Sequence, residues 1–227
     1  MNEEQNAEKS SVKEEKQPEK KHRLSSKIVI NYITQTAIFG GLAAILYCVP
    51  VFQFNLLFVA PGFMKIHLDD IPILLSSLAS GPLIGVFELL LKTLIKLPMT
   101  STLTVGELGD LMYSLALILP ASFIYKYNRT FKGAIIGLSV GLVSTLFFSS
   151  VVNLYTIFPF YKWLWHLEDG YIANSFNAIF NWGITNDGDI RLAVLLLPFN
   201  AIKNAIVLGV TFIAYKPLRF LLEKVYK

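Results

Sequence analysis

Charge and cysteine are both scarce in this chain of 227 residues. Charged residues make up 16% of it and hydrophobic residues 54%, a balance outside the usual range of soluble domains. The single cysteine, Cys48, excludes an intramolecular disulfide and a thiolate metal cluster. Because a membrane crossing needs roughly 20 apolar residues, roughly five to seven crossings would use the whole chain. The composition therefore predicts an integral membrane protein with little room for a soluble catalytic domain.

Familiar enzyme motifs are also missing. The sequence has no glycine-rich phosphate loop, no His-Glu-x-x-His, no Gly-x-Ser-x-Gly and no Cys-x-x-Cys. The three histidines, His22, His67 and His166, fall in the tail or in expected outer loops, which gives no support to a proton relay through the membrane. We expect a protein that is not an enzyme and has no catalytic residue, metal site or cofactor. Energy for any uphill transport must then come from another subunit or from an ion gradient.

Residues 1–27 differ sharply in composition from the rest of the chain. They hold six acidic and seven basic residues and almost no apolar ones, a composition typical of disordered segments. Because the acids and bases of this segment nearly balance, the formal net charge of +4 does not indicate nucleic-acid binding. The sequence predicts a disordered, charged cytoplasmic tail, followed by an uncleaved anchor that begins at Ile28.

Long apolar runs predict an all-α integral membrane protein, a bundle of six transmembrane helices over residues 28–222 with a short cytoplasmic end at 223–227. The expected helices are 28–52, 69–80, 83–97, 106–126, 133–160 and 190–216. Gly81-Pro82 favours a tight reversal between the second and third, with one long kinked helix as the alternative.

Lysine and arginine in the short connections predict the orientation of the bundle. Basic residues cluster around the 127–132 loop and at the C-terminal end, so both termini are expected in the cytoplasm. The outer connections are then 53–68, 98–105 and 161–189. The last is rich in aromatic residues, which predicts an ordered outer loop or an interfacial helix that caps the bundle.

Polar residues within apolar helices are the candidate functional residues, since burying them in lipid is costly. Asn200, Lys203 and Asn204 share one face of the last helix because they are spaced i, i+3 and i+4. Amide and ammonium groups together suit a planar ligand edge of alternating carbonyl and N–H groups. A structural hydrogen-bond network between helices is an equally open interpretation. Asn153 and Asp110 are further polar residues of this kind.

The other charged residues suit structural roles. Glu88 and Lys92, spaced i, i+4, predict a local ion pair. Asp69 and Asp70 are predicted to stabilise the start of a helix. Glu107 is predicted to do the same, with ligand contact as its second role.

Small residues predict close packing of helices. Gly133, Gly137 and Gly141 form a stripe that favours packing within the chain. In the first helix two pairs compete, Ala37 with Gly41 and Gly40 with Ala44, and either suits an internal or an external partner.

Four segments carry a family resemblance. Residues 63–72 (FMKIHLDDIP), 81–86 (GPLIGV), 106–108 (GEL) and 132–137 (KGAIIG) resemble, in order and spacing, the substrate-binding S components of energy-coupling factor (ECF) transporters. The similarity covers about residues 28 to 216 and is closest to the riboflavin-uptake type. The sequence departs from that type at His67 and at Gly109-Asp110.

The resemblance implies a subunit of a bacterial plasma membrane that captures riboflavin or FMN from outside. It also implies partnership with a membrane-embedded T subunit and two cytoplasmic ATPases, closure of the 53–68 loop over the ligand, and tipping of the bundle. The flavin-contacting residues that it implies are Asn153, Asn200 and Lys203, and the full predicted binding set adds Asn204, Lys65, Glu107 and Asp110. The implied docking residues are Ala37, Gly40, Gly41 and Ala44, of which Gly40 and Ala44 fit best.

The sequence alone leaves four alternatives open. The chain could be an S component for another vitamin, a stand-alone membrane enzyme, an ion-coupled carrier independent of ATPases, or a purely structural or assembly subunit. The lack of two similar halves in the sequence disfavours the carrier.

Overall fold

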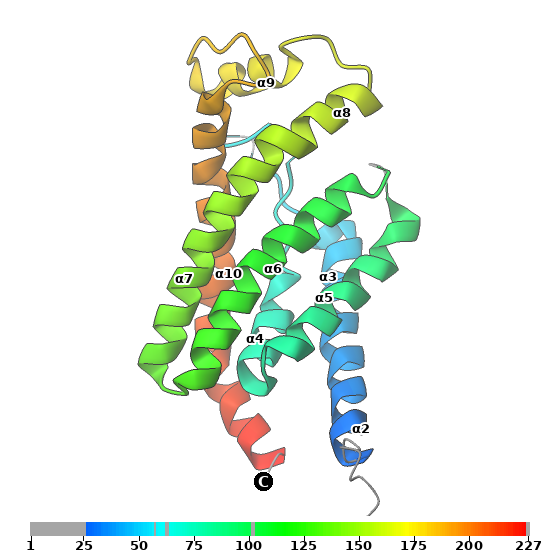
Figure 1. Cartoon of the computed structure of the whole chain (residues 1–227), viewed down its shortest axis with the longest axis vertical. Coiled ribbons are helices and arrows are strands. Elements are labelled where there is room, and N and C mark those ends of the chain that lie inside the picture. Colours follow the sequence, from blue (N-terminus) through cyan, green and yellow to red (C-terminus); the bar gives the residue numbers. More distant parts are fainter. Residues whose placement is uncertain (1–25, 57, 62–63, 101–102, 226–227) are drawn as a thin grey trace, which may run out of the picture. The chain divides into compact units, whose positions relative to one another are not determined.

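The computed structural model describes residues 26–56, 58–61, 64–100 and 103–225 (Figure 1). The charged tail predicted over 1–27 therefore lies almost wholly outside the described residues. The chain divides into two units, Met1–Asn31 and Tyr32–Lys227. The second unit holds the helical bundle and the polar residues predicted to bind a ligand.

The secondary structure of the described residues is helical, as predicted, apart from an isolated β-bridge between Phe54 and Ile66. The elements in chain order are α2 (Ser26–Gln35), η1 (Thr36–Gly40), α3 (Gly41–Cys48), η2 (Pro50–Phe52), α4 (Asp70–Ser80), α5 (Pro82–Lys96), η3 (Leu97–Met99), α6 (Val105–Tyr127), α7 (Phe131–Val152), η4 (Asn153–Ile157), α8 (Phe158–Leu164), α9 (Tyr171–Phe180) and α10 (Ile190–Val225).

Four stretches of the described chain are long and apolar enough to cross a membrane, namely Ile28–Cys48, Val105–Tyr127, Phe131–Leu164 and Ile190–Tyr215. The first contains a π-helical turn at η1, and the third contains another at η4. Helices α4 and α5, with 11 and 15 residues, are shorter than a usual span. All six predicted helices are present, whereas six crossings stay a prediction.

The reversal predicted at Gly81-Pro82 is confirmed. Gly81 has a φ of 109°, a backbone conformation that residues with a Cβ rarely adopt, and Pro82 begins α5. Helices α4 and α5 are therefore separate and fold back on each other in Figure 1.

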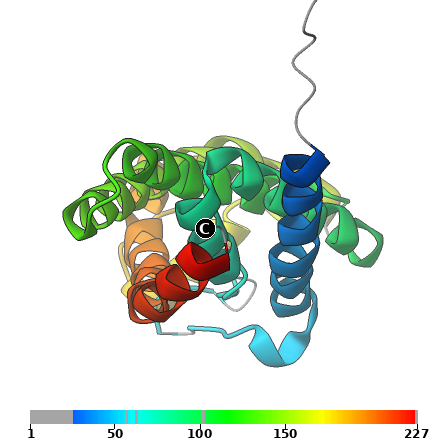
Figure 2. The same ribbon diagram turned by 90° about the horizontal axis from the view of Figure 1, so that it is seen from below.

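Glycines bring α6 and α7 together, as the stripe in the sequence predicts. A Cβ on Gly137 would lie 2.6 Å from the carbonyl oxygen of Ala121, and one on Gly141 would lie 2.4 Å from that of Leu117. Any side chain at these positions would push the helices apart. Helix α10 packs against α4 and α7, and these helices are seen end-on in Figure 2.

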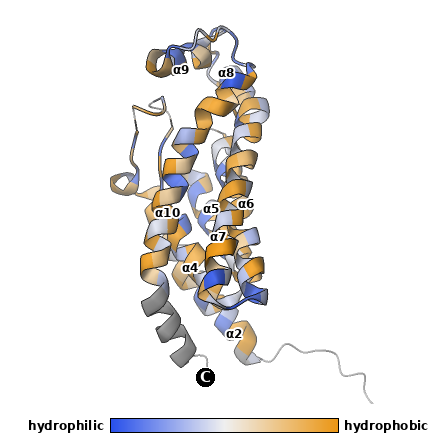
Figure 3. Ribbon diagram, turned by 90° about the vertical axis from the view of Figure 1, so that its left-hand side faces the viewer, coloured by the Kyte–Doolittle hydropathy of each residue, from blue (hydrophilic) through white to orange (hydrophobic). Residues whose placement is uncertain are grey.

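The opposite side of α7 is exposed yet apolar. Ile136, Val140, Val143 and Phe147 follow helical spacing and are all exposed, Phe147 by 68%. Figure 3 shows hydrophobic residues along the lengths of α6, α7 and α10. A continuous exposed apolar stripe of this kind suits contact with lipid.

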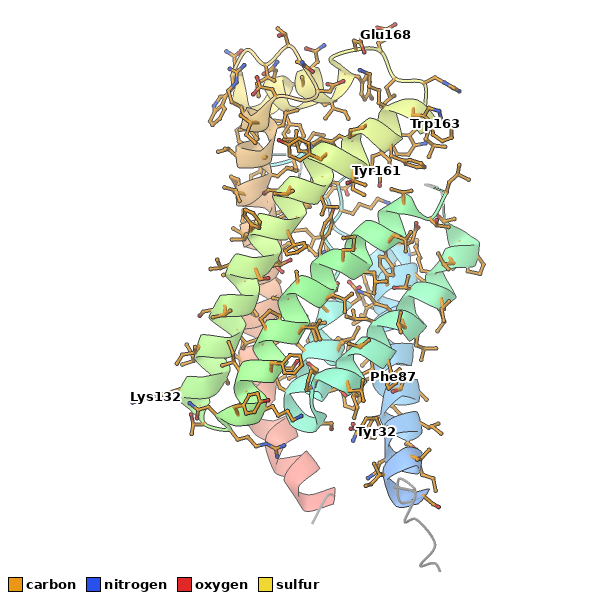
Figure 4. The ribbon with its side chains drawn as sticks, viewed as in Figure 1. Tyr32, Phe87, Lys132, Tyr161, Trp163 and Glu168 are labelled. Carbon is orange, nitrogen blue, oxygen red and sulfur yellow. The ribbon has the colours of Figure 1, made fainter. Side chains whose placement is uncertain are left out.

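The aromatic segment 161–189 is ordered and contains α9. The carboxylate of Asp187 accepts hydrogen bonds from the N–H groups of Gly170 (3.0 Å) and Ala173 (2.8 Å), which stabilises the start of that helix. Figure 4 places Glu168 of this segment and Lys132 of the basic α6–α7 turn at opposite ends of the bundle. This arrangement agrees with the predicted outer and cytoplasmic loops.

Candidate functional site

A buried charge cluster joins α4, α5, α6 and α10. The Nζ of Lys92 forms ion pairs with Asp69, with Asp70 (3.1 Å) and with Asp110 (3.1 Å). Lys203 reaches the other oxygen of Asp110 at 3.3 Å. Lys92 and Asp69 are both 0% exposed, so these charges stabilise one another within the bundle rather than through solvent.

This cluster corrects two predictions. The expected pair of Glu88 with Lys92 is wrong, because Lys92 binds the three aspartates and Glu88 instead accepts a hydrogen bond from Ser76 Oγ at 2.5 Å. Asp69 is the N-cap residue of α4 but its side chain makes no capping bond. The sequence spacing could not show this, because the partners of Lys92 come from other helices.

A cavity of about 260 Å³ lies beside the cluster, just below the range of roughly 300–1,000 Å³ typical of small-molecule sites. Its walls come from α3, the 53–67 loop, α5, the start of α6, η4 with α8, and α10. Phe158, Tyr161 and Phe199 supply aromatic surface. The cavity thus combines flat apolar walls with several polar groups.

Six of the seven predicted binding residues line this one cavity: Lys65, Glu107, Asp110, Asn153, Asn200 and Lys203. They come from four separate parts of the chain, so folding brings them together. Asn200 Nδ2 is buried and has no hydrogen-bond partner among the described residues. Such a donor is costly to leave unsatisfied, which favours a ligand over a closed structural network at this position.

The seventh residue, Asn204, has a different position. Its amide donates to the carbonyl oxygen of Asn200 at 2.8 Å, and it does not line the cavity. The i, i+4 spacing that suggested a shared ligand face instead produces a bond along the helix. Asn204 therefore supports the helix that presents Asn200.

Glu107 lies both at the cavity and in the first turn of α6. Its Oε2 accepts a hydrogen bond from Thr100 Oγ1 at 2.8 Å, and the N-cap residue of α6, Thr104, makes no side-chain capping bond. Glu107 thus lies in the first turn of α6, where its charge complements the helix dipole as predicted, and it also bonds to the preceding loop.

The described residues at the two ends of the 53–67 loop bond to one another and to α3. Phe54 and Ile66 exchange backbone hydrogen bonds of 3.0 and 2.7 Å. Gln53 donates to the carbonyl oxygen of Tyr47 at 3.0 Å and accepts from Lys65 at 3.1 Å. The loop is thereby tied to the end of α3, and it holds Lys65 at the cavity.

Sequence reasoning missed six polar residues of the cavity wall: Tyr47, Gln53, His67, Lys96, Tyr113 and Tyr161. Tyr113 had a usable signal, because Gly106, Asp110 and Tyr113 are spaced i, i+4 and i+7 and share a helix face. Tyr47 had none, since an apolar helix with a tyrosine near its end is typical of an interface anchor.

His67 packs edge-on against the ring of Tyr47, with ring centroids 5.0 Å apart. Its Nδ1 has no hydrogen-bond partner among the described residues. Burial lowers the pKa of His67 to about 4, against the raising effect of Asp110 and with the lowering effects of Lys203 and Lys92. The imidazole is therefore neutral near pH 7.

The small residues of the first helix face two ways. Gly40 and Ala44, the pair that fitted best for docking, are buried, and a Cβ on Gly40 would lie 3.0 Å from Leu91 and 3.3 Å from the Cα of Glu88. They pack against α5 inside the chain, which corrects their assignment to an external face. Ala37 is exposed, and a Cβ on Gly41 meets no atom of the described residues within 4 Å.

Comparison with known proteins decides the family. Residues 31–215 match the sequence profile described as "ECF transporter, substrate-specific component". The chain belongs to this family. The resemblance that the motifs carried is thereby confirmed.

Two named transporters are similar in sequence to this S component. It is 27% identical over 184 residues to the riboflavin transporter RibU of Staphylococcus aureus, covering 81% of this chain and 89% of that protein. It is 26% identical over 165 residues to the riboflavin transporter FmnP of Bacillus subtilis, covering 69% and 79%.

A solved S component of a bacterial ECF transporter has the same fold. The two chains superpose with a TM-score of 0.67 at 21% identity, over 86% of this chain and 98% of the other. At that identity the likeness supports the fold alone. The riboflavin named for the two sequence relatives bears on this S component only as a proposal.

Proposed function

We propose that this S component is the flavin-binding subunit of an ATP-driven vitamin importer in a bacterial plasma membrane. It binds riboflavin, or the related flavin FMN, from outside and delivers it inward together with a T subunit and two ATPases. The observation that carries the proposal is the convergence of Asn153, Asn200 and Lys203 on one cavity with aromatic walls.

The chemistry of these three residues suits a flavin ring. Asn200 and Lys203 supply donors for ring carbonyls, and the rings of Phe158 and Phe199 supply surface for a flat heterocycle. Asn153 is fixed by its own bond to the carbonyl oxygen of Ser149 at 2.7 Å, at the first residue of a π-helical turn. Single π turns recur at functional sites, where they change the direction of side chains.

The position of the cavity supports capture from outside. Tyr161, which lines it, lies towards the Glu168 end of the bundle, away from the basic turn at Lys132 (Figure 4). Since basic turns favour the cytoplasm, the cavity faces the exterior in this orientation. Lys65 and the neighbouring Met64 and His67 of the predicted covering loop line the cavity at this end of the site.

Copurification tests whether the ligand of this S component is a flavin. The chain, expressed in bacteria grown with riboflavin and purified in detergent, should release a flavin that mass spectrometry identifies at nearly one per chain. Incubation with other vitamins should not raise the unfolding temperature, whereas riboflavin or FMN should. Protection by a different vitamin and none by flavins would contradict the proposal.

Docking to the T subunit is proposed for Ala37, which is exposed, and Gly41, which is half-buried. Gly41→Leu should block assembly with the T subunit and leave flavin binding intact, because a Cβ at this position meets no atom of the described residues within 4 Å. Gly40→Leu is the matched comparison, and it should instead lower the stability of the isolated chain through its clash with α5. If Gly41→Leu assembles normally with the T subunit, the docking face lies elsewhere on the chain.

An ion-coupled carrier is the second candidate, and the buried cluster around Lys92 favours it, since charges within a membrane often mark ion pathways. Uptake assays separate the two. Flavin uptake that persists in cells lacking the ATPase partners would support the carrier, and loss of uptake would support the ECF mechanism.

A further inference from the structure

Three polar atoms of the cavity wall have no partner among the described residues. They are Nδ1 of His67, the hydroxyl of Tyr113 and Nδ2 of Asn200, each buried from solvent. Each unpaired polar atom in such a place is unfavourable unless something completes its hydrogen bonds. Three of them around one cavity indicate that the bound ligand supplies the missing partners.

We propose that His67 and Tyr113 are ligand-contacting residues that, together with Asn200, set the specificity of this site for a flavin. The inference rests on the proposed function and names two residues that the sequence motifs did not assign to the ligand. His67 comes from the loop before α4 and Tyr113 from α6, so they approach the ligand from different walls.

The contacts around His67 and Tyr113 do not use Nδ1 of His67 or the hydroxyl of Tyr113. The ring of His67 lies edge-on against Tyr47, and the preceding residue, Ile66, is fixed by its backbone bonds to Phe54. Tyr113 is accommodated by a glycine, because a Cβ on Gly109 would lie 3.3 Å from the tyrosine hydroxyl and 2.9 Å from Ile157. At His67 the site is therefore preorganised, which reduces the entropy lost on binding.

The three groups offer complementary chemistry. The amide nitrogen of Asn200 only donates, so it requires a ligand acceptor such as a ring carbonyl. The Tyr113 hydroxyl donates or accepts, and a neutral imidazole nitrogen accepts an N–H when the proton is on the other ring nitrogen. A flavin has ring carbonyls, one ring N–H and several hydroxyl groups, and it can satisfy all three.

The test is a riboflavin titration of the purified full chain and its variants. Tyr113→Phe removes only the hydroxyl and His67→Ala removes the imidazole, and each should weaken riboflavin binding about five- to thirty-fold. Tyr155→Phe is the matched control for the tyrosine, since Tyr155 lies nearby in η4, is 67% exposed and does not line the cavity. That control should bind like the wild type.

A second readout separates contact from structure. Because the Tyr113 hydroxyl has no partner among the described residues, Tyr113→Phe should leave the unfolding temperature of the ligand-free chain unchanged or slightly higher. Weaker binding with unchanged ligand-free stability supports the inference, and His67→Gln should recover part of the affinity lost in His67→Ala.

Three outcomes would overturn the inference in distinguishable ways. If the wild type binds riboflavin and both variants bind it equally well, the two contacts are refuted while the proposed function stands. If the variants lose ligand-free stability in proportion to their loss of affinity, the residues are structural. If the wild type binds no flavin, the proposed function fails and this inference fails with it.

Discussion

Two groups of buried polar side chains lie side by side in this molecule and differ in how they are satisfied. Around Lys92, the three aspartates and Ser114 bind one another, with Ser114 donating to Asp70 at 2.6 Å. Around the cavity, atoms of His67, Tyr113 and Asn200 have no partner among the residues described. In the first group each charged side chain has an ionic partner, although Asp69 Oδ1 has none among the described residues, and Lys92, Asp69 and Asp70 are almost fully buried. His67 and Tyr113 are half-buried. Under the proposed function, the first group holds the fold and the second contacts the ligand.

One residue joins the two groups. Asp110 binds Lys92 through one oxygen at 3.1 Å and Lys203 through the other at 3.3 Å. Lys203 lines the cavity, whereas Lys92 does not. The two lysines therefore share a carboxylate but should respond differently to substitution.

Replacing Lys92 should have the largest effect on stability. Lys92→Met leaves three buried carboxylates without their main cation, which typically costs about 3–5 kcal/mol. We expect a large fall in unfolding temperature or loss of the folded chain. Lys96→Met is the matched control, because Lys96 lies one turn further along α5, near the same Tyr47 ring, and is only half-buried. Equal stability of the two variants would refute the structural role of the cluster.

Replacing Lys203 should mainly affect binding. In Lys203→Met, Asp110 keeps its bond to Lys92, so the free energy of unfolding should fall by only about 1 kcal/mol. Riboflavin binding should weaken about ten-fold, because a charged donor to the ring is lost. Titration and thermal unfolding of the same preparation measure both. If Lys203→Met loses as much unfolding free energy as Lys92→Met, the two groups do not differ in their structural role.

Acid should destabilise the chain through His67. Its pKa is about 4 in the folded chain and about 6.5 when unfolded, so the unfolded chain binds more protons between these values. Stability is then fully present above pH 6.5 and is lost as the pH falls towards 4, by roughly 1 kcal/mol at pH 5.5. His67→Gln should remove this part of the pH dependence. Identical acid profiles of wild type and variant would contradict the buried, neutral histidine.

Glu88 should show the smallest effect. It is 0% exposed but bonds only to the neutral hydroxyl of Ser76 among the described residues, and a glutamine oxygen can accept that same bond. Glu88→Gln should therefore change the free energy of unfolding by less than about 1 kcal/mol. Chemical denaturation measures it. A change like that of Lys92→Met would mean that burial alone, and not ionic partners, decides the cost.

Most of the fold was predictable because it depends on local signals. Apolar runs predicted the helices, and Gly81-Pro82 predicted the reversal between α4 and α5. Gly137 and Gly141 predicted the close contact of α6 with α7. The π-helical turns at η1 and η4 were not predicted, because no local residue pattern requires them. The membrane orientation stays a prediction from the positions of Lys and Arg.

The site was predictable only in part. Asn200 and Lys203 stand out because polar residues in an apolar helix need partners. The partners of Lys92 and the contribution of His67 depend on which helices meet, and i, i+4 spacing wrongly paired Lys92 with Glu88. The same spacing misplaced Asn204, whose amide bonds along its own helix. Local spacing gives the face of a helix, whereas the tertiary arrangement decides what that face meets.

Fluorescence titration of riboflavin with the purified chain and with Asn200→Ala tests the central claim most directly. Quenching of the vitamin's fluorescence should saturate near one flavin per wild-type chain with sub-micromolar affinity, and the variant should bind about ten-fold more weakly. Absence of saturable quenching by the folded wild-type chain, or equal affinity of the variant, would contradict a flavin site built around Asn200.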